Sequence, residues 1–151
     1  MKVRNIIQRP AAVIEIDATI ADAAREMARQ GVGTLVVLDH HRLVGIVTDR
    51  DLVVRGLARS VPLDSRIDSI MSMDVIAIEA DSDVTEAVKA FAHHAVRRLP
   101  VVDGDAVCGV LSIDDLAIAT AQQLGELAKG VTAQALFPHA ADLPPVPALV
   151  R

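Results

Sequence analysis

Two short stretches of this chain place a carboxylate three residues after a hydroxyl, a spacing that suits two kinds of chemistry. Thr48 precedes Asp51, and Ser112 precedes Asp115, with the two pairs 64 residues apart. At a helix start the hydroxyl accepts a backbone N–H and the acid favours the positive helix end. A carboxylate can also accept both hydroxyls of a ribose, and helix N-terminal N–H groups suit a phosphate. The same spacing recurs at other expected helix starts, so both a cap and a ligand site are open.

Two adjacent arginines form a second group of side chains suited to a ligand. The guanidinium groups of Arg97 and Arg98 offer several donors in a planar fork, which fits a phosphate. The alternative is a pair of solvated charges at a strand start, the commoner position of arginine. Alternation along a strand sends the two side chains to opposite faces, and we favour Arg98 as the ligand-facing one. Because the matching residues Gly33 and Thr34 carry no charge, we expect two unequal sites.

Histidine pairs and a single cysteine are the remaining reactive side chains. The adjacent histidines at 40–41 and 93–94 are poorly spaced to share one metal ion. Cys108 matches Val44 of the other half, which favours a small core residue over a nucleophile. The sequence shows no nucleophile, base and orienting group together, so we expect no catalytic residues, no metal and no enzyme activity.

Composition narrows the class of protein. The 151 residues are 52% hydrophobic, enough for a real core, but hold two Phe and no Tyr or Trp. A net charge of −5 and the lack of an aromatic platform argue against nucleic acid as a partner. No apolar run is long enough to span a bilayer, no apolar leader stands at the N-terminus, and one cysteine cannot form an internal disulfide. These features predict a cytoplasmic protein without a membrane partner.

The hydroxyl–acid pairs belong to a longer internal repeat. One helix face is written twice, each position displaced by 64 residues: Ile20, Ala23, Ala24, Met27 and Ala28 recur as Val84, Ala87, Val88, Phe91 and Ala92. Strands are expected around each helix, at 12–16, 34–38 and 43–47 in the first copy and at 75–78, 98–102 and 107–111 in the second. A further helix begins after Thr48 and after Ser112.

These elements predict an α+β fold made of two tandem β-α-β-β-α repeats packed as a pseudo-two-fold pair. The helical crossover makes the first two strands of each repeat parallel, and the short turn makes the next pair antiparallel. One such unit cannot bury both faces of its sheet, whereas two pressed together can, with clefts at their interface. The expected divisions are repeat one at 1–62, repeat two at 63–124, and a C-terminal helix or extended Pro-rich tail at 125–151.

The repeated phrases carry a family resemblance. The sequences "GIVTDRDL" at 45–52, "GVLSIDDL" at 109–116 and "AVRRLPVVD" at 95–103 resemble those of a stand-alone tandem cystathionine beta-synthase (CBS) domain pair, a Bateman module. The resemblance implies a regulatory sensor that binds AMP, ADP, ATP, NAD(H) or S-adenosylmethionine in clefts between the repeats. It also implies that the aspartates accept the ribose hydroxyls, with Thr48 and Ser112 beside the same ligand.

The resemblance has consequences for partners as well. It implies a homodimer, no required cofactor, and a signal carried to an unidentified protein by a shift in conformational population. Expected ligand-binding residues are Thr48, Asp51, Ser112, Asp115, Arg97 and Arg98. The alternative is a structural dimerisation module whose clefts hold no ligand.

Overall fold

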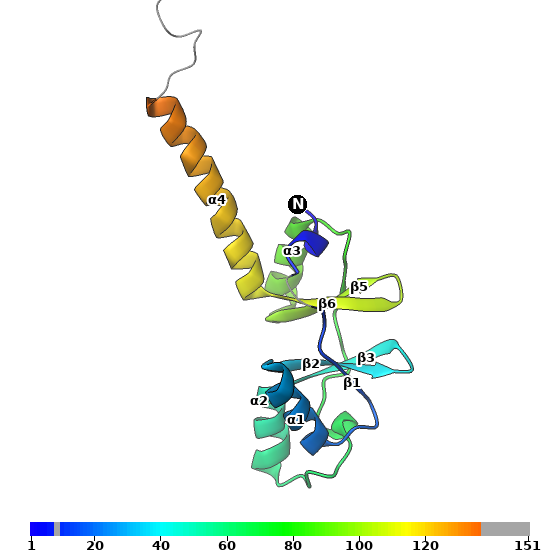
Figure 1. The fold of residues 1–151 in the computed structure, drawn as a ribbon. Coiled ribbons are helices and arrows are strands. Elements are labelled where there is room, and N and C mark those ends of the chain that lie inside the picture. The colour runs from blue at the N-terminus through cyan, green and yellow to red at the C-terminus, as the bar shows by residue number, and fades with distance from the viewer. Residues whose placement is uncertain (8–9, 137–151) are drawn as a thin grey trace, which may run out of the picture. The chain divides into compact units, whose positions relative to one another are not determined.

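The computed structural model describes residues 1–7 and 10–136 of the chain. It divides into two compact units, Met1–Leu116 and Ala117–Arg151, and the first contains the strands of both repeats (Figure 1). The C-terminal stretch 125–151 is helical as far as Leu136, and its Pro-rich part lies outside the described residues. Within the described part, no helix combines the length and apolar character needed to cross a membrane.

Repeat one is a three-stranded sheet with helices on its connections. Strand β1 pairs in parallel with β2, and β2 pairs antiparallel with β3, as the sequence predicts. The elements are β1 (Val13–Glu15), α1 (Ile20–Gln30), β2 (Thr34–Asp39), β3 (Arg42–Thr48) and α2 (Asp49–Asp51). A π-helical turn, Leu52–Gly56, and a 3₁₀ turn, Leu57–Arg59, continue α2.

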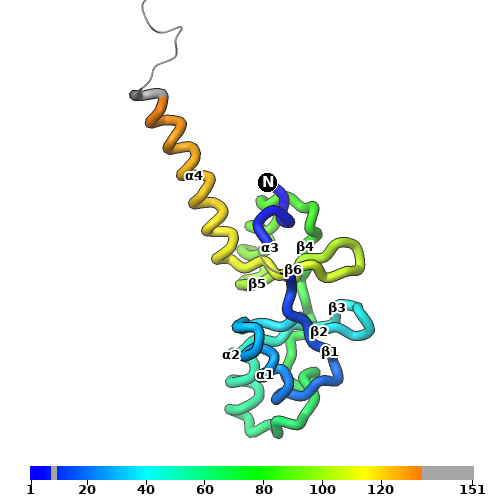
Figure 2. Tube along the Cα trace, in the orientation of Figure 1, coloured from blue at the N-terminus to red at the C-terminus, as the bar shows by residue number. Residues whose placement is uncertain are grey.

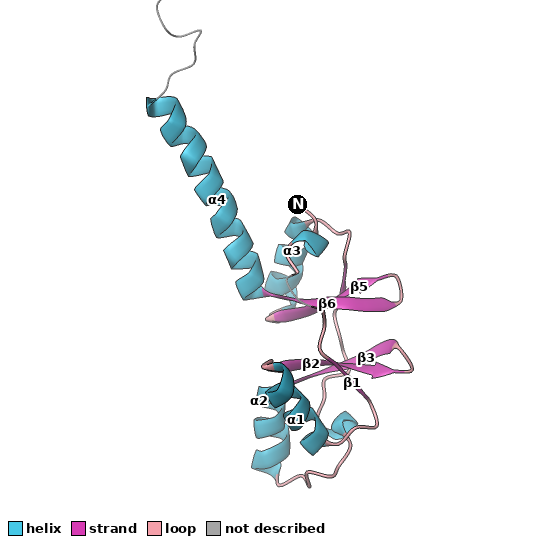
Figure 3. Ribbon diagram, in the orientation of Figure 1, coloured by secondary structure: helices cyan, strands magenta, loops and turns pink. Residues whose placement is uncertain are grey.

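Repeat two has the same topology in its own sheet (Figure 3). Its elements are β4 (Ile78–Glu79), α3 (Val84–His94), β5 (Arg98–Asp103), β6 (Ala106–Ser112) and α4 (Ile113–Leu136). The register repeats as well, because Val37 faces Gly45 and Val101 faces Gly109, with an irregularity after Val37 and after Val101. The expected strand at 75–78 is wrong in extent, since pairing begins only at Ile78.

Local capping explains where α1 begins and ends. Thr19 accepts a hydrogen bond from the Asp22 N–H at 3.0 Å, and the Asp22 carboxylate accepts one from the Thr19 N–H at 3.0 Å. This capping box satisfies two backbone donors that the first turn leaves unpaired. Gly31 ends α1 with φ of 65°, a left-handed conformation that costs glycine little.

The single apolar helix face expected from the sequence is divided in the structure. Ile20, Ala23 and Met27 of α1 are buried, whereas Ala24 and Ala28 are exposed. The same division occurs in α3, where Ala87 and Phe91 are buried, while Val88 is 48% exposed and Ala92 is exposed. A helix packed on one side of a sheet buries a narrower stripe than the sequence provides, so each helix keeps an apolar edge uncovered.

The two repeats exchange their N-terminal segments, an arrangement that could not be predicted from the sequence. The Val3 N–H donates to the Ser82 carbonyl of repeat two at 2.9 Å. Its counterpart, the Ile67 N–H of the linker, donates to the Ala18 carbonyl of repeat one at 2.9 Å. Val3 and Ile67 are both fully buried. The tube in Figure 2 shows the blue N-terminal segment beside α3 and the green linker beside α1, so each repeat completes the core of the other.

Candidate functional site

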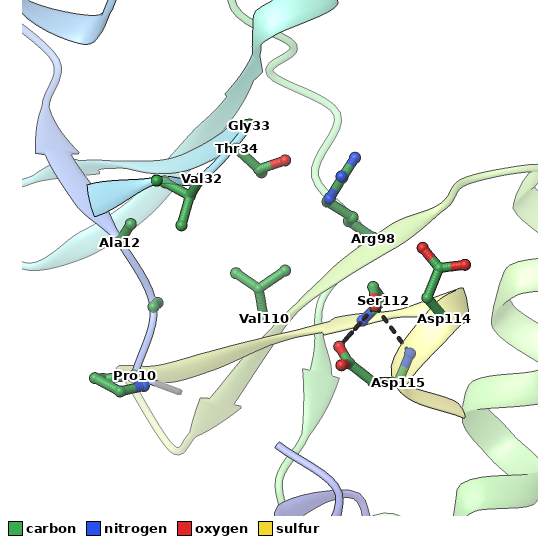
Figure 4. A pocket seen from close by; sticks show the side chains of 12 residues that line it. Pro10, Ala12, Val32, Gly33, Thr34, Arg98, Val110, Ser112, Asp114 and Asp115 are labelled. Carbon is green, nitrogen blue, oxygen red and sulfur yellow. Dashed lines mark hydrogen bonds between the residues drawn. The ribbon is translucent and has the colours of Figure 1, made fainter. Parts of the chain in front are cut away.

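A pocket of about 390 Å³ is lined by residues of both repeats (Figure 4). Its volume falls in the range of small-molecule sites. One wall comes from the segment before β1 and the loop between α1 and β2, and the other from the start of β5, the end of β6 and the start of α4. The lining residues are Pro10, Ala11, Ala12, Gly31, Val32, Gly33, Thr34, Arg98, Val110, Ser112, Asp114 and Asp115.

Ser112 and Asp115 form a closed hydrogen-bonded unit at the edge of this pocket. The Asp115 Oδ2 atom accepts from the Ser112 N–H at 3.0 Å and from the Ser112 hydroxyl at 2.6 Å, and the Asp115 N–H donates to the Ser112 Oγ at 3.0 Å. Within the described residues the second oxygen, Oδ1, has no partner. The cap therefore uses one carboxylate oxygen and leaves the other available, so capping and ligand binding are compatible.

Thr48 and Asp51 reproduce the cap in repeat one but differ in what faces the aspartate. Asp51 Oδ2 accepts from the Thr48 N–H at 2.9 Å and from the Thr48 hydroxyl at 3.0 Å. Its Oδ1 lies 3.6 Å from Arg55 Nε, and Arg55 also donates to the Ile70 carbonyl and the Ser72 hydroxyl. Neither Thr48 nor Asp51 lines the pocket. The corresponding position in repeat two is Ala119, so Asp115 lacks such a cationic neighbour.

The structure separates the two arginines. Arg98 pairs with Ser112 across β5 and β6, so both side chains lie on the same face of the sheet, and Arg98 lines the pocket. Arg97 does not line it. The Arg97 carbonyl instead accepts from the Ile113 N–H at 3.1 Å and fixes the start of α4.

Two lining residues with polar side chains were not recognised from the sequence as site residues. Thr34 is only 7% exposed, and its Oγ1 atom is buried without a hydrogen-bond partner. In Figure 4 this hydroxyl points toward the side of the pocket that holds Arg98. Asp114, which is exposed, adds a second carboxylate at the start of α4 beside the half-buried Asp115. A signal for Thr34 existed, because it is the repeat-one counterpart of Arg98.

The other reactive residues lie apart from this pocket. Cys108 is exposed on β6 rather than in the core, so the core prediction is wrong. Desolvation of its thiol, aided by the nearby Asp103 carboxylate, raises the Cys108 pKa. A raised pKa opposes thiolate formation, which is the opposite of what an activated sulfur nucleophile at Cys108 would need. Among residues 1–7 and 10–136, no group of three or more His, Cys, Asp or Glu side chains is placed to hold a metal ion.

Comparison with known proteins identifies the family to which this architecture belongs. The family model described as "CBS domain" matches residues 3–56 and 67–121, one match on each repeat. The chain belongs to the CBS domain family. This chain is also similar to the uncharacterized 17.7 kDa protein in the bps2 3′ region of Acidianus ambivalens. It is 37% identical over 120 residues, covering 78% of this chain and 72% of that protein.

Two solved CBS structures resemble this chain and hold adenosyl compounds. The CBS domain protein PAE2072 from Pyrobaculum aerophilum, complexed with AMP, has a TM-score of 0.74 and 30% identity, covering 85% of this chain and 99% of that one. The CBS domain pair of protein MJ0100, in complex with 5′-methylthioadenosine and S-adenosyl-L-methionine, has a TM-score of 0.73 and 25% identity, covering 82% and 98%. The tandem CBS pair predicted from the repeated phrases, and the α+β fold predicted from the pattern of strands and helices, are thus confirmed.

Proposed function

We propose that this CBS pair is a non-catalytic regulatory module that binds an adenosyl small molecule in the pocket beside Asp115. The observation that carries the proposal is the unpartnered Oδ1 of Asp115, held by the Ser112 cap at the edge of a pocket of about 390 Å³. A carboxylate fixed in this way is prepared to accept the two neighbouring hydroxyls of a ribose. The AMP, methylthioadenosine and S-adenosylmethionine complexes of similar CBS proteins support the same ligand class.

The remaining lining residues fit the rest of such a ligand. Val32 and Val110 provide apolar walls for an adenine ring, with Pro10 at the same pocket. Arg98 provides a guanidinium for an anionic group on the ligand. Ser112 orients Asp115 and adds a hydroxyl beside the ribose, so each predicted residue of repeat two except Arg97 has a role.

We propose Thr48 and Asp51 as a second, weaker ligand position. Asp51 already has Arg55 near its second carboxylate oxygen and is only 16% exposed. A ligand hydroxyl would have to compete with that guanidinium. The difference between Arg55 and Ala119 therefore favours unequal affinities at the two aspartates.

The proposed signal is a shift in conformational population on binding. A ligand that contacts both repeats stabilises their closed arrangement only by as much as it binds that arrangement more tightly.

We also propose that the chain is a homodimer, because α1 and α3 keep exposed apolar positions such as Ala24 and Val88. The same apolar positions favour the alternative, a structural dimerisation module without a ligand.

Calorimetric titration with AMP, ATP and S-adenosylmethionine tests the proposal. We expect saturable binding of at least one compound, together with a melting temperature that rises with its concentration by mass action. If none binds at millimolar concentration while the protein is dimeric, the structural alternative is correct.

A further inference from the structure

The pocket carries two opposite charges that its fold leaves unpaired. Arg98 opens β5 directly across from Ser112, and Asp114 follows Ser112 by two residues. Both side chains are exposed and line the pocket, and neither forms an ion pair or side-chain hydrogen bond with another described residue. In Figure 4, Arg98 and Asp114 lie on one side of Ser112 and the Asp115 carboxylate lies on the other. If Asp115 binds the ribose, Arg98 and Asp114 are the charged side chains that would face the substituent on the 5′ carbon of the ligand.

Thr34 marks the same part of the pocket independently of these charges. Its hydroxyl is buried, lacks any hydrogen-bond partner and points toward Arg98 (Figure 4). Buried polar atoms are normally satisfied, so an unpaired hydroxyl that lines a pocket indicates a ligand atom able to hydrogen-bond there. A hydroxyl both donates and accepts, so Thr34 suits a carboxylate or an ammonium group.

The charges discriminate between ligand tails. A triphosphate would bring several negative charges to a pocket with one guanidinium and two carboxylates, and Asp114 would repel it. A tail with one anionic and one cationic group would satisfy both side chains, its carboxylate on the Arg98 fork and its cation on Asp114. Repeat one has Arg50 at the position of Asp114, so this combination belongs to repeat two alone.

We infer that this pocket selects adenosyl compounds whose 5′ substituent is a zwitterionic amino acid, and that Asp114 excludes polyphosphates. The inference rests on the proposed function, since it takes the adenosyl part as bound through Asp115. It assigns to Asp114 a role in specificity rather than in affinity for adenosine itself. The relevant discrimination is the ratio of affinities for the two tails.

Four compounds test this inference by calorimetry on the full chain. S-adenosylmethionine and S-adenosylhomocysteine carry the amino-acid tail, ATP carries the triphosphate, and 5′-methylthioadenosine carries no charge on its tail. We expect S-adenosylhomocysteine to bind at least tenfold more tightly than ATP at low ionic strength. This ratio should fall as salt is added, because the charges concerned are exposed.

The matched variant is Asp114→Arg, which places in repeat two the residue that repeat one has at this position. The site is exposed, so the variant should fold with an unchanged far-ultraviolet circular dichroism spectrum. We expect the preference for S-adenosylhomocysteine over ATP to fall at least 30-fold, while 5′-methylthioadenosine binding changes less than threefold. The reciprocal variant Arg50→Asp serves as the control, because Arg50 does not line this pocket, and it should leave the preference in the tighter of the two binding transitions unchanged.

The outcomes separate the two proposals. If 5′-methylthioadenosine binds but ATP binds as well as S-adenosylhomocysteine, or if Asp114→Arg leaves their ratio unchanged, the selection inference is wrong and the proposed function stands. If none of the four compounds binds, the proposed function fails and the selection inference fails with it.

Discussion

Replacing Asp115 with Asn divides the two roles that one carboxylate has in repeat two. The Asn side-chain oxygen can stay where Oδ2 accepts from the Ser112 N–H and hydroxyl, which keeps most of the cap. The amide nitrogen then takes the place of the unpartnered Oδ1. An acceptor for ribose becomes a donor, so the change strikes the proposed ligand contact far more than the fold.

The two effects have different magnitudes. Loss of the negative charge at the start of α4 should cost a few tenths to about 1 kcal/mol of unfolding free energy. Loss of one hydrogen bond between a hydroxyl and a charged acceptor costs about 1.5–3 kcal/mol of binding free energy. That range corresponds to about a tenfold to hundredfold loss of affinity. We therefore expect a melting temperature within a few degrees of the parent and a clear fall in affinity for 5′-methylthioadenosine and AMP.

Asp51→Asn is the matched control in repeat one. It disturbs the same type of cap but also removes the charge that faces Arg55 at 3.6 Å. We expect a stability loss at least as large as that of Asp115→Asn, with a smaller change in affinity. Thermal unfolding and calorimetric titration of both variants check this. Equal affinities in the parent and both variants, with changes only in melting temperature, would show that both aspartates are helix caps and nothing more.

Three further predictions concern the scaffold. Gly45→Ala should lower the unfolding free energy by about 1–3 kcal/mol in urea titrations. A Cβ atom there would lie 2.6 Å from Sδ of the buried Met71 and 3.1 Å from the Ser72 carbonyl oxygen, which is held by a hydrogen bond from the Ile46 N–H. Gly56→Ala, with nothing within 4 Å, should not lower it. Hydrogen bonds from the Thr19 backbone, Arg25 and the Thr19 side chain lower the Asp22 pKa from 3.8 to about 2. The ionised Asp22 therefore stabilises the folded state fully above pH 4, and this stabilisation is lost as the pH falls toward 2. Asp22→Asn should flatten this part of the acid unfolding curve. Val88→Glu should convert a dimer to a monomer by light scattering, and a parent that is already monomeric would contradict the dimer proposal.

The repeat explains why so much of the fold could be predicted. A constant displacement of 64 residues relates Val37 and Gly45 to Val101 and Gly109, down to the irregularity in each hairpin. Periodicity and turn residues act locally, so they are readable in sequence. The strand expected at 75–78 shows the limit, because pairing begins only at Ile78, where β5 offers backbone partners.

Site residues were harder to predict where their role depends on distant neighbours. Ser112 and Asp115 could be predicted as site residues from their three-residue spacing, and Arg98 from its charge. The importance of Thr34 arises from an unpaired hydroxyl, and no sequence pattern reports whether a partner is missing. The difference between Asp51 and Asp115 likewise depends on Arg55, whose orientation follows from the π-helical turn Leu52–Gly56 and the linker carbonyl of Ile70.

The exchange of N-terminal segments has a consequence for how such a chain can arise. The pairing of Lys2 with Asp83 and that of Arg66 with Thr19 are the same contact made in opposite directions. A polypeptide with one repeat could make these contacts only as a dimer in which the two copies exchange their N-terminal segments. Two such polypeptides would already hold every contact of this kind seen here. Joining them end to end by gene duplication and fusion would require no new packing, only a linker, after which the two halves could diverge as Arg50 and Asp114 have done.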